Sequence, residues 1–107
     1  MAIYKMLVWS DPSSPDREDA YNDWYSASHM PDILKVPGVV SAQRLSGQGN
    51  ARIPQRYLAI YSLDTDDPEA VVAEIRRRVK SGEISSAPEL IVNVESRVLR
   101  LVDDENL

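Results

Sequence analysis

The sequence lacks cysteine and phenylalanine altogether and has a single histidine, His29, among its 107 residues. Without cysteine the chain forms neither disulfides nor thiolate metal sites. One histidine then leaves only carboxylates as further metal ligands, and the acidic residues near the second predicted helix are better explained as a loop and a helix cap. We therefore expect no metal site. The carboxylates concerned are Asp64, Asp66 and Asp67.

A basic surface is also missing, since 12 lysines and arginines stand against 17 aspartates and glutamates. A net charge of −5 has the wrong sign for a protein that neutralises nucleic-acid phosphates. The one basic run, Arg76 to Arg78 with Lys80, falls in the last turns of a predicted helix, where cations complement the negative helix end. We expect no nucleic-acid partner.

Long hydrophobic runs are absent as well. The apolar stretch Met6–Trp9 is broken at once by Ser10-Asp11-Pro12, so it is too short for a signal peptide or a membrane span. These observations predict a cytoplasmic protein with no membrane partner. Gly47-Gln48-Gly49 lacks the third glycine of a dinucleotide-binding loop and does not open a helix. We expect no cofactor.

What is present resembles an ordinary globular chain, with 43% hydrophobic and 27% charged residues, and its length predicts one domain spanning residues 1–107. Hydrophobic periodicity and turn signals predict the order strand, helix, strand, strand, helix, strand. That order is typical of an α+β, ferredoxin-like βαββαβ fold, with a four-stranded antiparallel sheet and two helices on one face. The expected ranges are strand 3–9, a helix from 15 that ends or kinks near His29 because of Pro31, strands 39–45 and 55–63, a helix from 66 to 82, and strand 90–102 with a bulge near Ser96.

Each predicted strand divides into two faces, because alternate residues point in opposite directions. The more apolar set is expected beneath the helices: Met6, Val8, Val40, Ala42, Leu58, Ile60, Val92 and Val94. The mixed set contains rings and polar groups and predicts a pocket wall or an interface: Lys5, Leu7, Trp9, Ser41, Gln43, Tyr57, Ala59, Tyr61, Asn93 and Glu95. A second copy laid sheet to sheet is the simplest cover, so we expect a homodimer whose interface includes Leu7, Trp9, Tyr57 and Tyr61. The first helix is expected to face the core through Ala20, Tyr21, Trp24, Ala27 and Ser28, with Trp24 as the anchor.

The residues 24–32 (WYSASHMPD), followed by 36–40 (VPGVV), resemble EthD-type proteins of the dimeric α+β barrel superfamily. Residues 56–61 and the Asp-Pro start of the second helix are similar to uncharacterised members of that group. The resemblance implies a ferredoxin-like subunit, a homodimer whose sheets pair into a barrel, and a cavity for a small-molecule ligand. Its members include polyketide cyclases, lactone isomerases, dehydratases and cofactor-free monooxygenases. Cyclase-like members use further histidines or tyrosines beside the one at the helix end, and no second histidine exists here.

His29 is the one side chain whose unperturbed pKa lies near neutrality, so it suits proton transfer next to a carbonyl. We predict His29 as general acid or base and Tyr25 as its helper; the alternative is that His29 only caps the helix. The residues expected to bind substrate are Trp9, Tyr57, Tyr61, Asn93 and Lys5, although Lys5 could instead pair with Glu95. The predicted function is that of a cofactor-independent lyase, cyclase or isomerase acting on a small cyclic or polyketide-like carbonyl compound. The alternatives are a cofactor-free monooxygenase and a non-catalytic small-molecule-binding protein.

Overall fold

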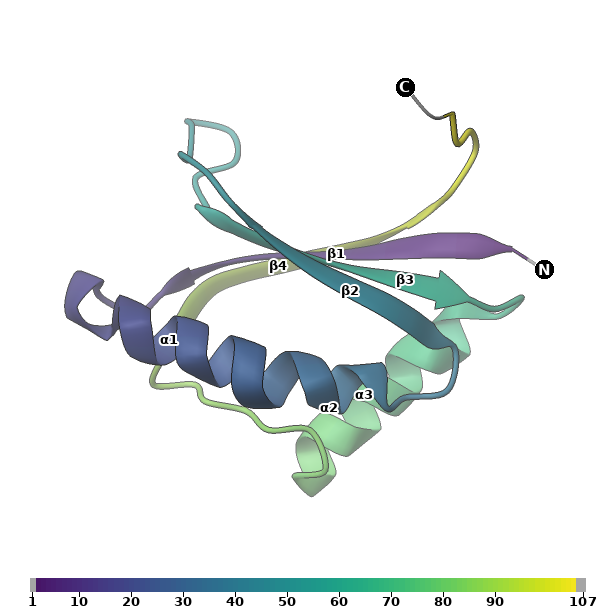
Figure 1. The fold of residues 1–107 in the computed structure, drawn as a ribbon, viewed down its shortest axis with the longest axis horizontal. Helices are drawn as coiled ribbons and strands as arrows, with labels where there is room; N and C mark the ends of the chain where they lie inside the picture. The colour runs from purple at the N-terminus through teal and green to yellow at the C-terminus, as the bar shows by residue number, and fades with distance from the viewer. Residues whose placement is uncertain (1, 106–107) are drawn as a thin grey trace.

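Four antiparallel strands form one sheet with the order β2-β3-β1-β4, and the helices cover one of its faces (Figure 1). The computed structural model describes residues 2–105. This arrangement is the predicted ferredoxin-like α+β fold. The strands are β1 (Ile3–Pro12), β2 (Val39–Ser46), β3 (Tyr57–Asp64) and β4 (Ile91–Arg100), and the helices are η1 (Pro15–Arg17), α1 (Glu18–Trp24), η2 (Tyr25–His29), α2 (Met30–Leu34) and α3 (Pro68–Ser81). Within residues 2–105 no helix is both long and apolar enough to cross a membrane.

Strand β1 is longer than predicted, because the turn signal at Ser10-Asp11-Pro12 does not end it. Asp11 and Pro12 pair with Val92 and Ile91 of β4. Ser10 is buried, and its hydroxyl lies 2.6 Å from that of Tyr21. Since the pairing and this hydrogen bond satisfy polar groups that would otherwise favour a loop, the tertiary structure overrides the local signal.

The first helix does not end at His29, which corrects the prediction from Pro31. It continues through η2, a π-helical turn, into α2 and ends at Leu34. The N–H of Met30 donates to the carbonyl oxygen of Tyr25, five residues back. A proline clashes with the carbonyl of residue i−4 and has no N–H to offer it. The wider π turn changes the hydrogen-bond spacing directly before Pro31, so the helix continues past the proline.

The face that this helix buries is made of tyrosines. Tyr21 and Tyr25 are almost fully buried, whereas Ala20 and Ala27 are exposed and Trp24 is half-buried. The prediction of Ala20 and Ala27 as core residues is therefore wrong, and Trp24 is not a fully enclosed anchor. In its first turns the helix thus contributes to the core two large rings that each carry a hydroxyl group.

Strand β3 presents the opposite faces from those predicted. Tyr61 and Ala59 are buried toward the helices and pair with Met6 and Val8 of β1. Leu58 and Ile60 pair with Trp9 and Leu7, and so lie on the sheet face turned away from the helices, here called the open face. Both sets in β3 are rich in apolar atoms, so the pattern itself could not separate them. Tyr57 and Tyr61 consequently cannot belong to an interface that covers the open face.

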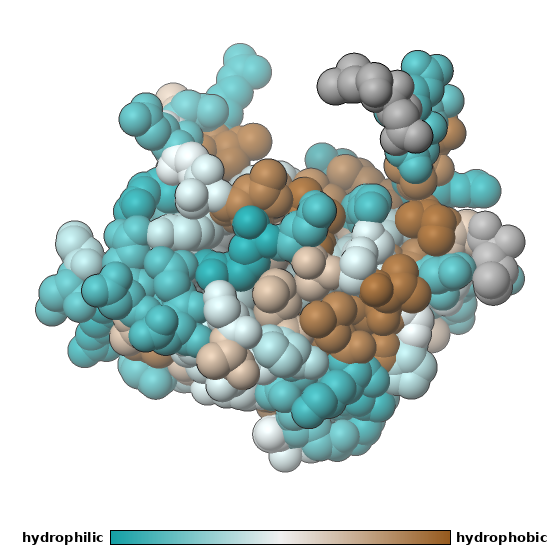
Figure 2. Space-filling view, in the orientation of Figure 1, coloured by the Kyte–Doolittle hydropathy of each residue, from teal (hydrophilic) through white to brown (hydrophobic). Residues whose placement is uncertain are grey.

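The open face carries apolar side chains without cover. Leu45 and Leu99 on its outer strands are 48% and 39% exposed, and they flank a centre that contains Leu7, Trp9 and Ile60. Figure 2 shows hydrophobic residues at the surface along the strands, while the surface over the helices is mainly hydrophilic. A surface of this kind is typical of an interaction site.

The β4 strand contains the irregularity that the sequence predicted, three residues earlier than expected. The register against β1 shifts between Trp9 and Asp11, and Asn93 has a φ of 56°. Asparagine tolerates this left-handed conformation better than most residues. The bulge is therefore at Asn93 rather than near Ser96.

Candidate functional site

His29 is held at the end of η2 by the loop that precedes β4. Its Nδ1 lies 2.7 Å from the carbonyl oxygen of Ser85. A carbonyl oxygen can only accept, so Nδ1 carries the proton and the neutral ring keeps its lone pair on Nε2. Among the hydrogen bonds of residues 2–105, none involves Nε2. The geometry thus prepares Nε2 to accept a proton.

Ser85 is fixed by two further contacts from the same helix. The Trp24 indole Nε1–H donates to Ser85 Oγ at 3.0 Å, and the Ser85 N–H donates to Asp32 Oδ2 at 2.9 Å. The imidazole of His29 also lies against two rings, with centroids 4.6 Å from Trp24 and 5.1 Å from Tyr25. The side chains of Trp24, Tyr25 and Asp32 and the main-chain carbonyl of Ser85 thus fix the orientation of the imidazole.

Burial lowers the pKa of His29 below its ordinary value of 6.5. The Ser85 carbonyl and the Asp32 carboxylate act in the opposite direction, because both stabilise the imidazolium, but burial has the larger effect. A histidine with this shift is uncharged near neutral pH. It is therefore suited to act as a base rather than as a helix-capping cation.

A second cluster lies further back along the same helix, where Arg44 of β2 packs among tyrosine rings. Its guanidinium carbon lies 4.3 Å from the ring centre of Tyr25 and 5.4 Å from those of Tyr21 and Tyr57. Its Nη2 donates to Asn22 Oδ1 at 2.9 Å. No ion pair of Arg44 occurs in the part of the chain that the structure describes. Cation–π contacts replace a carboxylate partner here.

Tyr57 connects this cluster to the start of α1. Its hydroxyl donates to Glu18 Oε2 at 2.5 Å and accepts from Asn22 Nδ2 at 3.2 Å. Arg56 holds the same carboxylate with two hydrogen bonds, at 2.9 and 3.3 Å. Hydrogen bonds from Arg56 and then Tyr57 lower the pKa of Glu18. The pair Arg56–Glu18 is exposed, so its main effect is to fix the geometry of this rim.

Two tyrosine hydroxyls lie deep between helix and sheet. Burial raises the pKa of Tyr25 to about 12, and it raises that of Tyr61 further. The Tyr61 hydroxyl is buried and has no hydrogen-bond partner among residues 2–105, although the neighbouring Tyr25 hydroxyl is one of the groups that raise its pKa. Neither phenol can lose a proton near neutral pH. Tyr25, predicted as a helper to His29, contacts the imidazole through its ring, and no hydrogen bond joins them among the described residues.

Lys5 lies on the open face and does not form the ion pair considered from the sequence. Its Nζ donates to Ser62 Oγ at 2.6 Å. In the sheet register Lys5 stands opposite Leu99, whereas Glu95 stands opposite Trp9. The two charges are therefore four residues apart along β4, and the register separates them.

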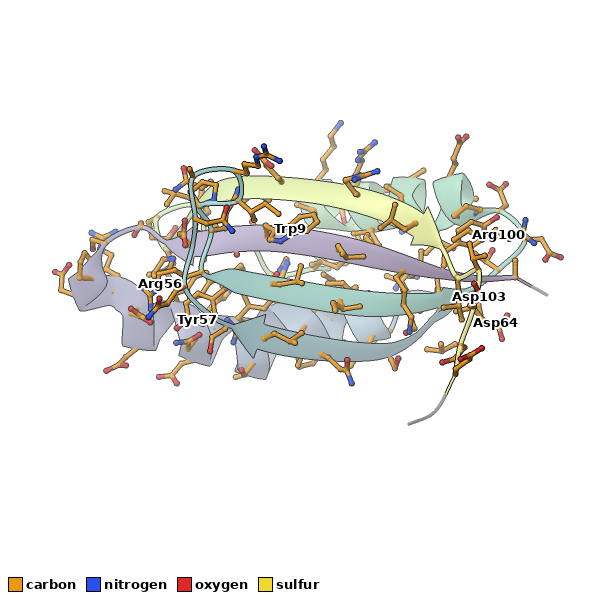
Figure 3. All side chains as sticks on the ribbon, turned by 90° about the horizontal axis from the view of Figure 1, so that it is seen from above. Trp9, Arg56, Tyr57, Asp64, Arg100 and Asp103 are labelled. Atoms are coloured by element: carbon orange, nitrogen blue, oxygen red, sulfur yellow. The ribbon has the colours of Figure 1, made fainter. Side chains whose placement is uncertain are left out.

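Trp9 and Tyr57 lie toward one end of the sheet (Figure 3), whereas Tyr61 is buried in the core farther along β3. Trp9 and Tyr57 line a cavity of about 200 Å³ together with Gln55 and Arg56. Asn93 and Arg56 line a neighbouring one of about 350 Å³. The Asn93 side-chain amide donates to Asp11 Oδ2 at 3.2 Å, and the main-chain carbonyl of Asn93 accepts from Gln55 Nε2 at 3.0 Å. Arg56 borders both cavities, so they form one polar region with a tryptophan wall, called here the Trp9 region.

His29 and the Trp9 region are separate. Tyr57 contacts Glu18, the first residue of α1, whereas His29 is the last residue of η2. Neither cavity of the Trp9 region is lined by His29 or Tyr25. The sequence predicted one site, but the structure separates His29 from the Trp9 region. The tyrosines of the first helix lie between them.

Sequence reasoning missed several residues that shape these places. Ser85 contributes a main-chain carbonyl, which no side-chain pattern can reveal. Arg44, Asn22 and Glu18 come together only because α1 crosses the edge strand β2 and the start of β3. The one available signal was Asp32, which lies inside the WYSASHMPD stretch that carried the resemblance.

Comparison with known proteins gives the fold. No protein-family model matches the sequence, and no curated protein matches it significantly. Among solved structures, an EthD family protein from Bacillus halodurans is similar over 100% of both chains, with 14% identity and a TM-score of 0.58. The heme-degrader MhuD from Mycobacterium tuberculosis, with two hemes bound in its active site, is similar over 96% of this chain and 99% of its own, with 12% identity and a TM-score of 0.64.

A dimeric ferredoxin-like protein of unknown function from Thermobifida fusca is similar over 94% of this chain and 92% of its own, with 11% identity and a TM-score of 0.57. These likenesses confirm the fold that the EthD resemblance implied. The chain thus shares a ferredoxin-like α+β fold with these proteins.

Proposed function

We propose that this protein moves a proton on a small cyclic or polyketide-like carbonyl compound, as a cofactor-independent lyase, cyclase or isomerase. The observation that carries the proposal is the hydrogen bond between His29 Nδ1 and the Ser85 carbonyl, which directs the ring's lone pair to Nε2. A group that accepts a proton next to a carbonyl must be unprotonated near pH 7 and fixed in orientation. His29 has both properties.

In the proposed step Nε2 takes a proton from carbon and later returns it to carbon or to a leaving oxygen. The positive charge that develops on the imidazole is stabilised by the Ser85 carbonyl and by Asp32, which fastens the Ser85 N–H. Tyr25 and Trp24 act as positioning residues, because their rings confine the imidazole. The mechanism needs no second histidine.

The pH dependence of the reaction follows from the lowered pKa of His29. Turnover should rise with pH along an acid limb whose midpoint lies below 6.5 and should be level near neutrality. The free energy of unfolding should depend on pH in the same direction as turnover. The unfolded chain binds the proton more readily, so the free energy of unfolding falls as pH drops below 6.5. A rate profile measured with any accepted substrate checks the limb, and a midpoint above 6.5 would contradict the role.

A second candidate is a non-catalytic binding protein, and the separation of His29 from the Trp9 region favours it. In that case a ring-containing ligand would stack on Trp9, with Tyr57, Asn93 and Arg56 supplying polar contacts. A ligand that raises the melting temperature and is recovered unchanged after long incubation would support this function. Replacing Trp9 with alanine should then remove the shift, while His29→Ala should leave it intact.

A cofactor-free monooxygenase is the third candidate, since a putative monooxygenase from Shewanella loihica shares the fold. It differs from the proton-transfer enzyme in consuming oxygen. Oxygen uptake with a candidate substrate and no added metal or flavin distinguishes the two reactions.

We also propose that a second copy covers the open face, as the predicted homodimer requires. The interface is corrected to Leu7, Trp9, Leu58 and Ile60, since Tyr57 and Tyr61 face the helices. Replacing Ile60 with glutamate should place two charges in a desolvated interface and halve the mass seen by light scattering. A wild-type protein that stays at 12.0 kDa at micromolar concentration would contradict the assembly.

A further inference from the structure

Four aromatic rings lie in contact one after another between the His29 site and the start of α1. The ring centres of Trp24 and Tyr25 are 5.3 Å apart, and those of Tyr25 and Tyr21 are 5.6 Å apart. Tyr21 in turn lies 5.2 Å from Tyr57. Aromatic rings at these separations are in van der Waals contact. The four rings therefore form an unbroken series from Trp24 to Tyr57, called here the aromatic path.

Both ends of the aromatic path reach the surface, and its middle is enclosed. Trp24 and Tyr57 are half-buried, whereas Tyr25 and Tyr21 are almost fully buried. Tryptophan and tyrosine are among the side chains that lose an electron most readily, and no cysteine is present to compete with them. A radical that reaches Trp24 can therefore oxidise it, and the rings behind it provide a route for an electron from Tyr57.

Among the residues that the structure describes, Tyr57 is the one member of the path bonded to a carboxylate. Its hydroxyl donates to Glu18 Oε2 at 2.5 Å. Hydrogen bonds from Arg56 and then from Tyr57 lower the pKa of Glu18, so the carboxylate is ionised near neutral pH. A phenol that has lost an electron is a strong acid, and even this carboxylate can take its proton.

The polar partners of the other rings are much weaker bases. The Trp24 indole N–H donates to the Ser85 hydroxyl at 3.0 Å, and the Tyr21 hydroxyl lies 2.6 Å from that of Ser10. A serine hydroxyl does not accept a proton near neutral pH. Since a tyrosine that can release its proton is easier to oxidise than a tryptophan, the oxidised state is most stable on Tyr57.

The charge of Arg44 prevents the oxidised state from resting in the middle of the path. Its guanidinium carbon lies 4.3 Å from the ring centre of Tyr25 and 5.4 Å from that of Tyr21. A cation at such distances raises the energy of a second positive charge. Tyr57 is also 5.4 Å away, but the loss of its proton to Glu18 leaves a neutral radical. The middle rings thus act as a bridge between the two ends.

We propose that the aromatic path carries one-electron oxidation away from the His29 site to Tyr57. An organic peroxyl radical or an inorganic radical takes an electron from Trp24 and becomes an anion. One electron then moves from Tyr57 to the oxidised indole, and the Tyr57 hydroxyl proton moves to Glu18. The indole is thereby restored, Tyr57 is a neutral phenoxyl radical, and Glu18 is a carboxylic acid.

This activity does not depend on the proposed function, because the transfer of a proton by His29 moves no single electron. It protects that site, since the indole 4.6 Å from the imidazole is the more easily oxidised ring. Tyr57 lies beside Arg56 at the end of the sheet (Figure 3). There a thiolate or ascorbate can supply an electron to the phenoxyl radical while Glu18 returns the proton.

Pulse radiolysis of an azide solution tests the path, because the azidyl radical oxidises tryptophan and is itself reduced to azide. The Trp9→Phe variant has Trp24 as its one indole. In this variant the absorption band of the indolyl radical should decay at a rate independent of protein concentration, while the phenoxyl band grows at the same rate. Adding Tyr57→Phe should abolish this growth and prolong the indolyl radical. Tyr4→Phe is the matched control, since Tyr4 is also half-buried and takes part in none of the ring contacts among residues 2–105; it should change neither band.

Glu18→Gln in the Trp9→Phe variant tests the proton acceptor at an exposed position. Glutamine can still accept the hydrogen bond from Tyr57 but is a far weaker base. Growth of the phenoxyl band should slow about 10²-fold, the lower end of what a positioned base contributes to proton transfer. If Tyr57→Phe leaves both bands unchanged, if Tyr4→Phe slows the transfer as much, or if Glu18→Gln transfers at the original rate, the proposed path is wrong.

Discussion

Replacing His29 with alanine should lower turnover about 10²–10⁴-fold, the usual contribution of a positioned general base. The loss should appear in kcat, because the imidazole acts on the reacting proton rather than on substrate binding. The folded protein should persist, since His29 is half-buried and makes one hydrogen bond to a neutral carbonyl. Such a bond contributes about 0.5–1.5 kcal/mol. Steady-state kinetics and urea unfolding of the same preparation measure both quantities.

Two matched variants separate chemistry from structure at this site. Ser85→Ala removes the acceptor for Trp24 Nε1 but leaves the main-chain carbonyl that holds His29, so it should reduce stability and spare turnover. Tyr25→Phe keeps the ring that touches the imidazole. If Tyr25 helps His29 only through this ring, the variant should keep its turnover. A clear rate loss in Tyr25→Phe would instead assign its hydroxyl to the reaction. Normal turnover in His29→Ala would remove His29 from the mechanism.

The fold was largely predictable because its signals are local and agree with one another. Pro68 after Asp67 begins α3, and the Asp67 carboxylate accepts from the N–H of Ala70 at 3.1 Å. Gly82 ends the helix with a φ of 83°. The arginines after Glu74 form the ion pairs that a solvated helix end predicts. Each feature needs only its own few neighbours, so sequence spacing determines it.

The faces of β3 and the length of the first helix were not predictable in the same way. Tyr57 can lie on the helix side of the sheet because Glu18 and Asn22 form hydrogen bonds with its hydroxyl. Those partners lie 39 and 35 residues away. Pro31 normally ends a helix, and only the π turn before it permits continuation. Both outcomes depend on contacts that alternation and local propensity do not encode.

The candidate site, too, has features that the sequence predicts and features that depend on tertiary contacts. His29 stands out in the sequence as the only histidine, and its chemistry follows from its type. Its tautomer follows from Ser85, 56 residues away, and its lowered pKa follows from burial. Trp9 and Tyr57 were grouped by parity, yet they line one cavity only because Tyr57 is the first residue of β3, where the sheet ends. Residue type predicts the chemistry, and tertiary packing decides which residues meet.

Replacing Tyr61 with alanine should destabilise the fold by about 3–5 kcal/mol, the cost of emptying a fully buried aromatic position. Tyr61 has no exposed surface and packs where β3 meets β1 beneath the first helix. In a domain of this size the loss should lower the melting temperature by roughly 4–8 °C for each kcal/mol. Urea unfolding measures this loss. The m-value should stay unchanged, because it depends on the surface exposed on unfolding, which the substitution changes little.

Removing the hydroxyl of Tyr61 should change the free energy of unfolding in the opposite direction from removing that of Tyr21. Tyr61→Phe removes a buried group without a partner, so stability should stay level or rise by about 1 kcal/mol. Tyr21→Phe breaks the 2.6 Å hydrogen bond to Ser10 and leaves that serine buried and unpaired, which should cost about 1–3 kcal/mol. The two variants delete the same atom type at equally buried sites, so their difference isolates the partner. An equal loss in both would mean that the Tyr61 hydroxyl is satisfied in solution, by the neighbouring Tyr25 hydroxyl or by a buried water.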